Sequence, residues 1–414
     1  MNIYIDCSRT YIFGGNTGIQ RVVRNIANNL PKHLNGITIK PVVILFGTYR
    51  EIACLRLKSD RILRFLKKIQ SLLFYKYADN NKAPFGNANA AGRWLVYSIV
   101  SMPVILKKRI HFSNGDVLIL PEHFTVMAFP GILRKLHDVG VRIGFICHDL
   151  LTVRYPQYYP KEDAVNFESH LRTTLEFSTF CIANSEYTKN DLKKYISETD
   201  IGTNVRLESF KLGYDLDSTN YDGYVRPEIL TVFKKLFPTY LAVSTIEPRK
   251  NYEYILNSFD QLWQNNPDIN LIIIGKVGWM CGHIVERILT HPLFNKRLFM
   301  FNDASDTELD FCYNRSKALV AASINEGFGL PIIEALSHGI YVLASGIPVF
   351  REVGKDFCSY FDINDPLGLS KEINRWEKTG IPPVVRRIKE FKWPNWKEST
   401  EELIDKILLC VDNQ

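Results

Sequence analysis

Two glutamates eight positions apart, Glu326 and Glu334, frame a glycine turn in the segment EGFGLPIIE. We expect this segment to lead from an apolar strand into a helix that begins at Pro331. The side chain of Glu334 then lies about one turn inside the helix and tilts back toward its start. Carboxylates only accept hydrogen bonds, so the groups that suit them are hydroxyls, such as those of a ribose or a hexose. Both glutamates can therefore flank one bound molecule.

The turn between the glutamates suits an anion. Gly327 and Gly329 allow the backbone to come close to a ligand, and the amides before Pro331 lie at the positive end of the helix. A phosphate held between two sets of hydroxyls is the outline of a nucleotide-sugar. The alternative is a helix start with incidental acids.

A basic turn, STIEPRKN (residues 244–251), follows the apolar strand expected at residues 240–243. Lys250, together with Arg249, lies where a diphosphate would sit, and Asn251 can cap the next helix. Breaking a sugar–phosphate bond leaves negative charge on the departing phosphate, so fixed cations favour the transition state over the ground state. Lys250 and Arg249 are thus catalytic candidates, and the alternative is an exposed basic turn.

The segment CHDLL (residues 147–151) comes directly after the apolar strand expected at residues 142–147. We expect His148 to face a cleft and hydrogen-bond the transferred sugar. Asp149 either orients His148 or anchors the loop, and it is a candidate on the acceptor side. A His–Asp pair with a purely structural role is the alternative.

Two further segments of the first third are weaker candidates. In the loop FGGNTG, Gly15 and Gly18 suit close approach to a phosphate or sugar of the donor, although a simple strand–helix turn explains them equally well. Glu122 and His123 follow the strand expected at residues 116–120 and are acceptor-side candidates.

The composition limits the class of protein. A chain of 414 residues favours two domains, and 46% hydrophobic with 23% charged residues is typical of a globular protein. The eight cysteines stand singly, without C-x-x-C pairs or a His cluster at zinc spacing, so no metal site is expected and a reducing compartment fits. The first residues show no signal-peptide pattern, and the most apolar run, 94–106, is too short to span a bilayer. We therefore expect a cytoplasmic protein.

Positive charge gathers in residues 56–76, which hold seven Lys or Arg against one Asp. Apolar residues recur there at helical spacing while the basic residues fall mostly elsewhere on the wheel. Such a helix can bind the anionic inner surface of the cell membrane, or it can pack in the core with a solvated basic face. No nucleic-acid-binding motif accompanies the patch, so no nucleic-acid partner is expected.

Short apolar strands alternate with helical patterns in both halves of the chain, which predicts parallel sheets in two doubly wound, Rossmann-like α/β domains. The polar stretch 213–227 reads as a linker. We expect an acceptor-side domain at residues 1–225, a nucleotide-sugar-binding domain at 226–392, and a last helix at 393–414 that crosses back to the first domain. Because ligands bind at the carboxyl ends of parallel strands, the site should lie in a cleft between the domains.

With these residues the chain resembles family 4 of the retaining glycosyltransferases, which have the two-Rossmann GT-B fold. The similarity covers nearly the full length: the glycine loop, the HDL segment, EPRKN, IIIGKVGW (272–279), and the stretch 306–362 that contains the E-x7-E motif. The last of these is highly specific, and the others are moderately so.

The resemblance implies a role for each matched residue. The ribose would be bound by Glu334, the donor sugar by Glu326 and the amides of Gly327, Phe328, Gly329 and Leu330, the diphosphate by Lys250, and the sugar near its reacting carbon by His148. Family members need no metal and retain the anomeric configuration, by front-face attack without an enzyme nucleophile. The only co-substrate implied is a nucleotide-sugar, GDP- or UDP-linked.

One donor-site position departs from the family pattern. Many relatives carry an arginine where this chain has Ser244, so phosphate neutralisation here rests more on Lys250 and Arg249. The pairing of EPRKN with GKVGW is similar to bacterial mannosyltransferases that build surface polysaccharides, which favours GDP-mannose. Acceptors in such pathways are glycans, often linked to a lipid.

Other functions are weaker readings. An NAD-dependent oxidoreductase would need a G-x-G-x-x-G after a strand, with an acid about 20 residues on, and this pattern is missing. A metal-dependent transferase would rest on the D-x-D formed by Asp215 and Asp217, which falls in the apparent linker. A degenerate nucleotide-sugar-binding protein, able to bind but not to turn over, stays as the non-enzymatic alternative.

Overall fold

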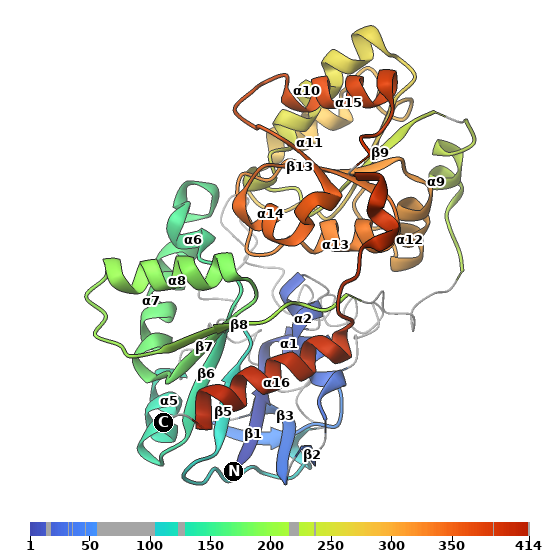
Figure 1. Cartoon of the computed structure of the whole chain (residues 1–414). Helices are drawn as coiled ribbons and strands as arrows, with labels where there is room; N and C mark the ends of the chain where they lie inside the picture. The colour runs from blue at the N-terminus through green and yellow to red at the C-terminus, as the bar shows by residue number, and fades with distance from the viewer. Residues whose placement is uncertain are drawn as a thin grey trace, which may run out of the picture.

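The computed structural model describes residues 1–13, 18–31, 33–34, 36–45, 47–55, 104–122, 129–214, 223–235, 237–383 and 385–412. The basic stretch 56–76, Gly15, His123, Asp215 and Asp217 lie outside these residues. The described chain forms two separate sheets, each with its own helices, and one lies above the other in Figure 1. We call each sheet with its helices the first and the second domain.

The first sheet has eight strands in the order β2-β3-β1-β5-β6-β7-β8, with β4 paired to β3. Its strands are β1 (Asn2–Asp6), β2 (His33–Leu34), β3 (Ile37–Leu45), β4 (Thr48–Glu51), β5 (Val117–Leu120), β6 (Arg142–Cys147), β7 (Phe180–Ala183) and β8 (Arg206–Ser209). All pairings are parallel except those of β2 and β4 with β3. The sequence analysis did not predict these two antiparallel strands. Gly36 and Gly47, with φ of 80° and 74°, make the tight turns that allow them.

Helices follow most strands of the first domain, as the alternating pattern predicts. They are α1 (Ser8–Phe13), α2 (Gly18–Asn29), α5 (Phe129–Asp138), α6 (Leu151–Arg154), η2 (Pro156–Tyr158), α7 (Lys161–Phe177) and α8 (Glu186–Glu198). The strands β5 and β7 are buried along their whole length, because helices cover both faces of the sheet. Helix α1, which begins two residues after the end of β1, was not predicted. The sequence analysis expected only the glycine loop FGGNTG, which starts at the last residue of this helix.

The second sheet has six parallel strands in the order β11-β10-β9-β12-β13-β14. They are β9 (Thr239–Val243), β10 (Asn270–Ile274), β11 (Leu298–Phe301), β12 (Ala318–Ala321), β13 (Tyr341–Ser345) and β14 (Cys358–Phe361). The accompanying helices are α9 (Pro227–Val232), η4 (Pro248–Lys250), α10 (Tyr252–Asn265), α11 (Gly282–Leu289), α12 (Asp306–Arg315), α13 (Leu330–Ser337), α14 (Pro348–Gly354), η5 (Lys355–Phe357), α15 (Gly368–Thr379) and η6 (Val385–Glu390).

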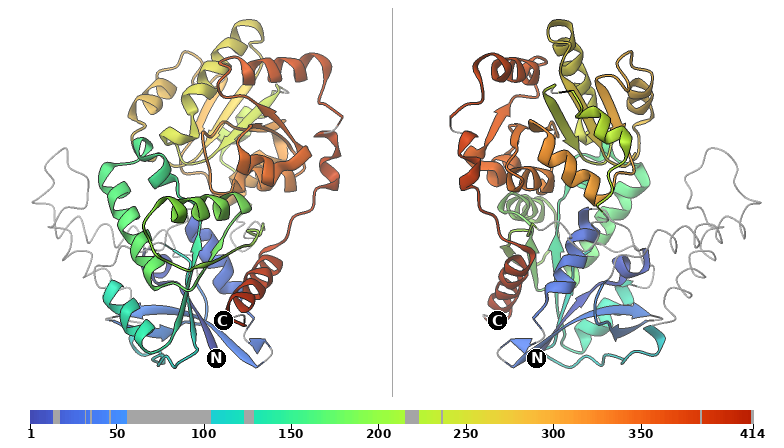
Figure 2. Two further views of the ribbon diagram at one scale, coloured as in Figure 1. Left: turned by 60° about the vertical axis from the view of Figure 1, so that its left-hand side comes forward. Right: turned by 90° about the vertical axis from the view of Figure 1, so that its right-hand side faces the viewer.

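The last helix, α16 (Trp396–Asp412), packs against α2, β7 and β8 of the first domain. Figures 1 and 2 show this red helix among the blue and green elements of that domain. The crossing segment is held before the helix begins, because the Trp393 indole N–H donates to the Leu212 carbonyl at 2.7 Å. Inside the helix the Ser399 hydroxyl donates to the Lys211 carbonyl at 2.6 Å. The boundaries 225/226 and 392/393 stay our proposal for the division into domains.

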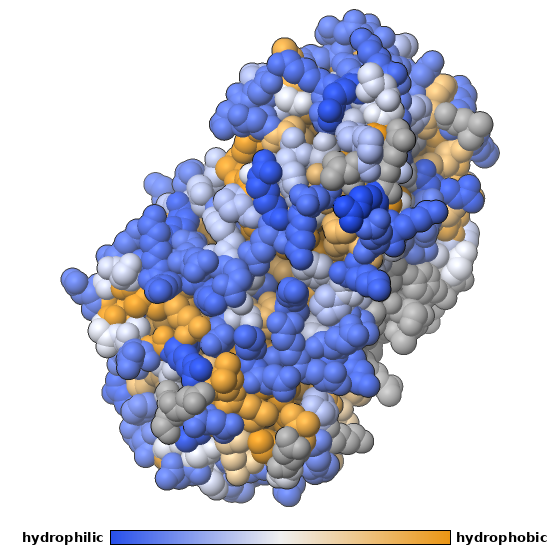
Figure 3. Space-filling model, in the orientation of Figure 1, coloured by the Kyte–Doolittle hydropathy of each residue, from blue (hydrophilic) through white to orange (hydrophobic). Residues whose placement is uncertain are grey.

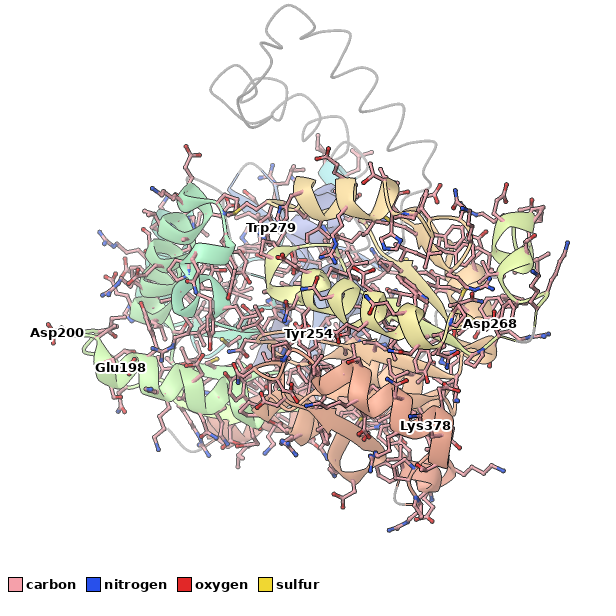
Figure 4. The ribbon with its side chains drawn as sticks, turned by 90° about the horizontal axis from the view of Figure 1, so that it is seen from above. Glu198, Asp200, Tyr254, Asp268, Trp279 and Lys378 are labelled. Atoms are coloured by element: carbon pink, nitrogen blue, oxygen red, sulfur yellow. The ribbon has the colours of Figure 1, made fainter. Side chains whose placement is uncertain are left out.

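The two domains meet through polar contacts between loops at the carboxyl ends of their strands. The Asn325 amide donates to the hydroxyls of Tyr155 and Tyr187, each at 3.0 Å. The Trp279 indole donates to the Tyr158 carbonyl at 2.8 Å, and Figure 4 shows Trp279 close to the green helices of the first domain. The Glu352 carboxylate of α14 accepts hydrogen bonds from the first two backbone amides of α8. The interface therefore joins the edges where the sequence placed the site.

Apolar side chains are concentrated inside the domains. The face drawn in Figure 3 is largely hydrophilic, with apolar atoms in patches on the lower, first domain. All eight cysteines are unpaired, and only Cys54 is exposed. Among the helices of the described ranges, none combines the length and hydropathy needed to cross a bilayer.

Candidate active site

Glu326 lies at the centre of a cluster of charges contributed by two neighbouring strands. Because β9 and β12 are adjacent and parallel, the turns that follow them meet at one edge of the sheet. The Ile324 amide donates to the Arg249 carbonyl at 2.8 Å and ties the two turns together. Arg249 Nη1 lies 2.6 Å from Glu326 Oε2, and Lys250 Nζ pairs with Oε1. The structure thus joins the EPRKN and E-x7-E segments.

The cluster balances two cations against two anions. Arg249 also contacts Glu247, with Nη2 and Oε1 2.6 Å apart, and the Ser323 hydroxyl donates to Glu326 Oε1 at 2.8 Å. Burial alone would raise the pKa of Glu326, but Arg249 and Lys250 outweigh it and lower this pKa to about 2. Burial and the charge of Arg249 lower the pKa of Lys250, while Glu326 opposes them. A diphosphate would therefore compete with Glu326 for Lys250.

Gly327 and Gly329 are required in the turn for different physical reasons. A Cβ built on Gly327 would lie 2.0 Å from the His148 carbonyl oxygen, and the Gly327 carbonyl accepts the Ser185 hydroxyl at 2.8 Å. Gly327 thus lets the backbone approach the first domain here, whereas the sequence analysis assigned this freedom to a ligand. Gly329 has φ of 110°, a conformation that favours glycine.

The helix after the turn begins one residue earlier than expected. Leu330 is its first residue, so Pro331 is the second, where a missing backbone N–H still costs nothing. Phe328 is buried, and its ring contacts Trp393 of the crossing segment edge-on at 6.0 Å. Any role of this turn toward a donor therefore belongs to its backbone, and that role stays a prediction.

Glu334 is bound from two directions, and one of them is the other domain. Arg21 Nη1, from α2 of the first domain, lies 2.9 Å from Glu334 Oε1. The Tyr313 hydroxyl donates to Oε2 at 2.8 Å. The side chain of Glu334 is only 2% exposed. Sequence reasoning missed Arg21 and Tyr313, because only the packing of α2 and α12 against α13 brings them to Glu334; the position of Arg21 three residues after Gly18 was the available signal.

Ser244 and Asn251 complete the basic turn. The hydroxyls of Ser244 and Tyr252 lie 2.8 Å apart, and a Cβ on Gly275 would lie 1.8 Å from the Ser244 carbonyl oxygen. The GKVGW segment therefore packs directly on this turn. Asn251 occupies the N-cap position of α10, as expected, but has φ of 56° and its side chain makes no capping hydrogen bond.

A cavity between the two turns is too small for a nucleotide-sugar. It measures about 20 Å³ and is lined by Ser244, Lys250, Glu326, Gly329 and Phe350, among others. This volume holds about one water molecule.

His148 is buried at the end of β6. Its Nε2 lies 2.7 Å from the Pro121 carbonyl oxygen, so this nitrogen carries the proton and Nδ1 is left as an acceptor in the neutral ring. Burial lowers the pKa of His148 and favours that neutral ring. The Pro121 carbonyl, rather than Asp149, orients the imidazole; Asp149 accepts the Leu151 amide at 3.1 Å and so anchors the loop.

The carboxyl edge of the first sheet carries two buried carboxylates. Glu122 accepts the Thr10 hydroxyl through Oε1, its Oε2 has no hydrogen-bond partner, and burial raises its pKa. Asp6 was not among the predicted residues. It accepts the Ser8 amide and the Tyr49 hydroxyl, both at 2.8 Å, and burial raises its pKa to about 6. Gly18 begins α2, and a Cβ there would meet no atom within 4 Å.

No group of three His, Cys, Asp or Glu side chains within the described ranges is arranged to hold a metal ion. The D-x-D of Asp215 and Asp217 lies outside those ranges. Metal independence therefore stays a prediction.

Comparison with known families identifies the second domain. Residues 231–391 match the model of the family described as "Glycosyl transferases group 1". The match contains both the basic turn and the E-x7-E segment, so the resemblance stated from these motifs is confirmed at the level of the family.

Characterised relatives are similar over most of this chain. It is 31% identical over 305 residues to the serotype-specific mannosyltransferase WbdA of Escherichia coli, covering 72% of this chain but 37% of that protein. It is 25% identical over 301 residues to the O-antigen chain mannosyltransferase RfbU of Salmonella typhimurium, covering 72% of this chain and 75% of that one. The chain thus spans little more than a third of the first relative.

A solved structure confirms the fold class. The Anabaena protein Alr3699/HepE, determined in complex with UDP and glucose, superposes with a TM-score of 0.60 at 13% identity, covering 99% of this chain and all of that one. The chain has the GT-B architecture of two Rossmann-like domains, as expected.

Proposed function

We propose that this chain transfers a hexose, with mannose favoured, from a GDP- or UDP-linked sugar to a glycan or lipid-linked acceptor in surface polysaccharide synthesis. The observation that carries the proposal is the joined cluster of Arg249, Lys250 and Glu326 at the carboxyl edge of a glycosyltransferase domain. The mannosyltransferases WbdA and RfbU, as relatives, support the choice of mannose and of an O-antigen type of acceptor.

The cluster suits the departure of a diphosphate. As the bond between the anomeric carbon and the phosphate oxygen breaks, its electron pair leaves with the diphosphate. The charge of Lys250 then has a stronger partner than Glu326, and Arg249 remains to hold Glu326. We propose that the acceptor oxygen attacks the same face of the sugar, so that the configuration is retained, and that its proton passes to the leaving phosphate.

The buried neutral imidazole of His148 supports a positioning role beside the sugar. Its Nε2–H is committed to the Pro121 carbonyl, which leaves Nδ1 as an acceptor for a sugar hydroxyl. We propose Glu122 for the acceptor side, because its free Oε2 is a second acceptor at the same sheet edge.

A donor screen tests the proposal. Thermal unfolding is measured with GDP-mannose, UDP-glucose and an ADP-sugar, since a ligand that binds only the folded protein raises its stability. The stabilising donor is then incubated with a lipid-linked oligosaccharide, and the product linkage is read by NMR. Transfer of mannose from GDP-mannose with an α linkage is the expected result. Product of inverted configuration would refute retention, and stabilisation by no nucleotide-sugar would refute the donor class.

The non-enzymatic alternative, a nucleotide-sugar-binding protein without turnover, is separated by the same assay. Wild type that binds the donor but neither transfers nor hydrolyses it would favour this alternative. A Glu326→Ala variant that loses turnover while wild type is active would instead favour the enzyme.

We further propose that the chain acts at the cytoplasmic face of the membrane, with the basic stretch 56–76 on anionic lipid. Neutralising Arg61, Arg64, Lys67 and Lys68 should weaken binding to anionic liposomes and spare transfer to a soluble acceptor. Equal liposome binding by the variant would favour the core-packed helix.

A further inference from the structure

We propose that Arg21 is a ligand of the donor diphosphate, supplied by the first domain, and that donor binding transfers its guanidinium from Glu334 to the phosphate. This inference rests on the proposed function, because it takes a nucleoside diphosphate as the ligand. Neither the family match, which begins at residue 231, nor the motifs of the sequence assign Arg21 a role.

The contact of Arg21 closes the predicted ribose site. Arg21 Nη1 lies 2.9 Å from Glu334 Oε1, and the Tyr313 hydroxyl already uses Oε2 at 2.8 Å. Tyr313 thus satisfies Oε2, whereas Oε1 is buried, faces the Arg21 guanidinium as an ion pair and accepts no hydrogen bond. Glu334 can accept a ribose hydroxyl on the side of the first domain only when Arg21 gives up its place.

Displacement leaves Arg21 in need of another anion. Its side chain is 28% exposed, so water solvates it only in part. Glu334 and, more weakly, Asp306 raise its pKa against the opposing effect of burial. A partly buried guanidinium without a partner is costly, whereas a diphosphate offers oxygens that match its fork of N–H groups.

The diphosphate site is within reach of the guanidinium. Glu334 is the fifth residue of α13, so its side chain, tilted toward the helix start, lies about one turn, or ~5 Å, from the first amides. A helix start is where a phosphate binds. Lys250 flanks the same turn through Glu326. Arg21 would thus approach the phosphate from the first domain and Lys250 from the second.

The competing explanation is that Arg21 has a purely structural role and only holds the two domains together. Its replacement would then weaken the binding of nucleoside and diphosphate alike. A phosphate ligand would affect only ligands that carry the phosphate. The contrast between a nucleoside diphosphate and its nucleoside therefore separates the two.

The experiment measures Kd by calorimetry for GDP, UDP, guanosine and uridine with the full chain. The variants are Arg21→Gln, Arg21→Lys and, as control, Lys317→Gln, which removes a 2.8 Å ion pair to Glu377 at the opposite, amino end of β12. Arg21→Gln should weaken the preferred diphosphate about 10- to 100-fold, the range of one or two charged hydrogen bonds. It should not weaken the matching nucleoside, because the ribose hydroxyl no longer has to displace Arg21 from Glu334.

The remaining arms keep the outcomes distinct. Arg21→Lys keeps the charge and should recover part of the diphosphate affinity, and its melting temperature shows that the fold is intact. Equal weakening of nucleoside and diphosphate, or no weakening at all, would overturn the role of Arg21 while leaving the proposed function in place. A wild type that binds no diphosphate would overturn the proposed function itself.

Discussion

Asp6 and Glu326 offer a comparison between the two sheet edges that face each other. Both are buried carboxylates beyond or at the end of a parallel strand. Asp6 is held by a backbone amide and hydroxyls, and burial raises its pKa to about 6. Glu326 is held by Arg249 and Lys250, which overcome burial and lower its pKa to about 2. The carboxylate of the second domain is thus held by fixed charges, and that of the first domain by neutral hydrogen-bond donors.

The largest effect should follow Glu326→Gln, which leaves two buried cations facing an amide. We expect the free energy of unfolding to fall by about 3–5 kcal/mol. Urea denaturation at neutral pH measures it, with Lys317→Gln as the control for an ordinary ion pair. A loss no larger than that of the control would mean that the cluster is not a stabilising unit.

The same variant should lose its effect in acid. The folded pKa of Glu326, about 2, lies below its ordinary 4.5, so its stabilisation is present above pH 4.5 and disappears as the pH falls toward 2. The stability curves of wild type and Glu326→Gln should therefore converge over that interval. Curves that stay parallel would contradict the assignment of the shift to Glu326.

Lys250→Ala should lower the transfer rate by ~10² or more, because the developing phosphate charge loses its nearest cation. The measurement is kcat/KM with a soluble acceptor, and the stability of the variant is recorded alongside. Arg249 still pairs with Glu326, so the fold should survive. Unchanged kinetics would remove Lys250 from the catalytic residues.

Asp6→Asn should have the opposite sign to Glu326→Gln. Because the folded pKa of Asp6 is raised from 3.8 to about 6, its favourable contribution is present below pH 3.8 and is lost as the pH rises through 6. Wild type should therefore lose about 2 kcal/mol relative to Asp6→Asn between pH ~4.5 and ~7.5. Unfolding free energies at those two pH values test this, and equal differences at both would refute it.

The smallest effect is expected from metal removal. Transfer in excess EDTA should change by less than about twofold, since the cations that face the phosphate are side chains. Loss of activity that Mg²⁺ or Mn²⁺ restores would show that a metal takes part.

The sequence predicted elements well where burial on both faces leaves a plain apolar run. The strand β6 begins and ends at the expected residues, and β5 and β9 each begin within one residue of the expected start. Edge elements were missed, because β4 contains Tyr49 and Arg50 next to Glu51 and depends on a glycine turn for its pairing. Local patterns do not record such pairings.

The site was predictable only in its local parts. Spacing within one segment brought Glu326 and Glu334 to notice, and the adjacency of β9 and β12 joined the first of them to the basic turn. The partners of Glu334 are Arg21 on α2 and Tyr313 on α12, which lie 313 and 21 residues before it in the sequence. Only tertiary packing brings them to Glu334. The reason for Gly327 was likewise invisible, since it depends on the backbone of His148 in the other domain.

The crossing of α16 determines how the gene can be divided. A fragment cut once between the sheets would keep that helix on the wrong piece, where Leu403, Ile404 and Ile407 would face water. The other piece would show a matching bare strip along α2, β7 and β8. Separately expressed halves should therefore aggregate. A soluble first domain should require residues 393–414 to be fused to it.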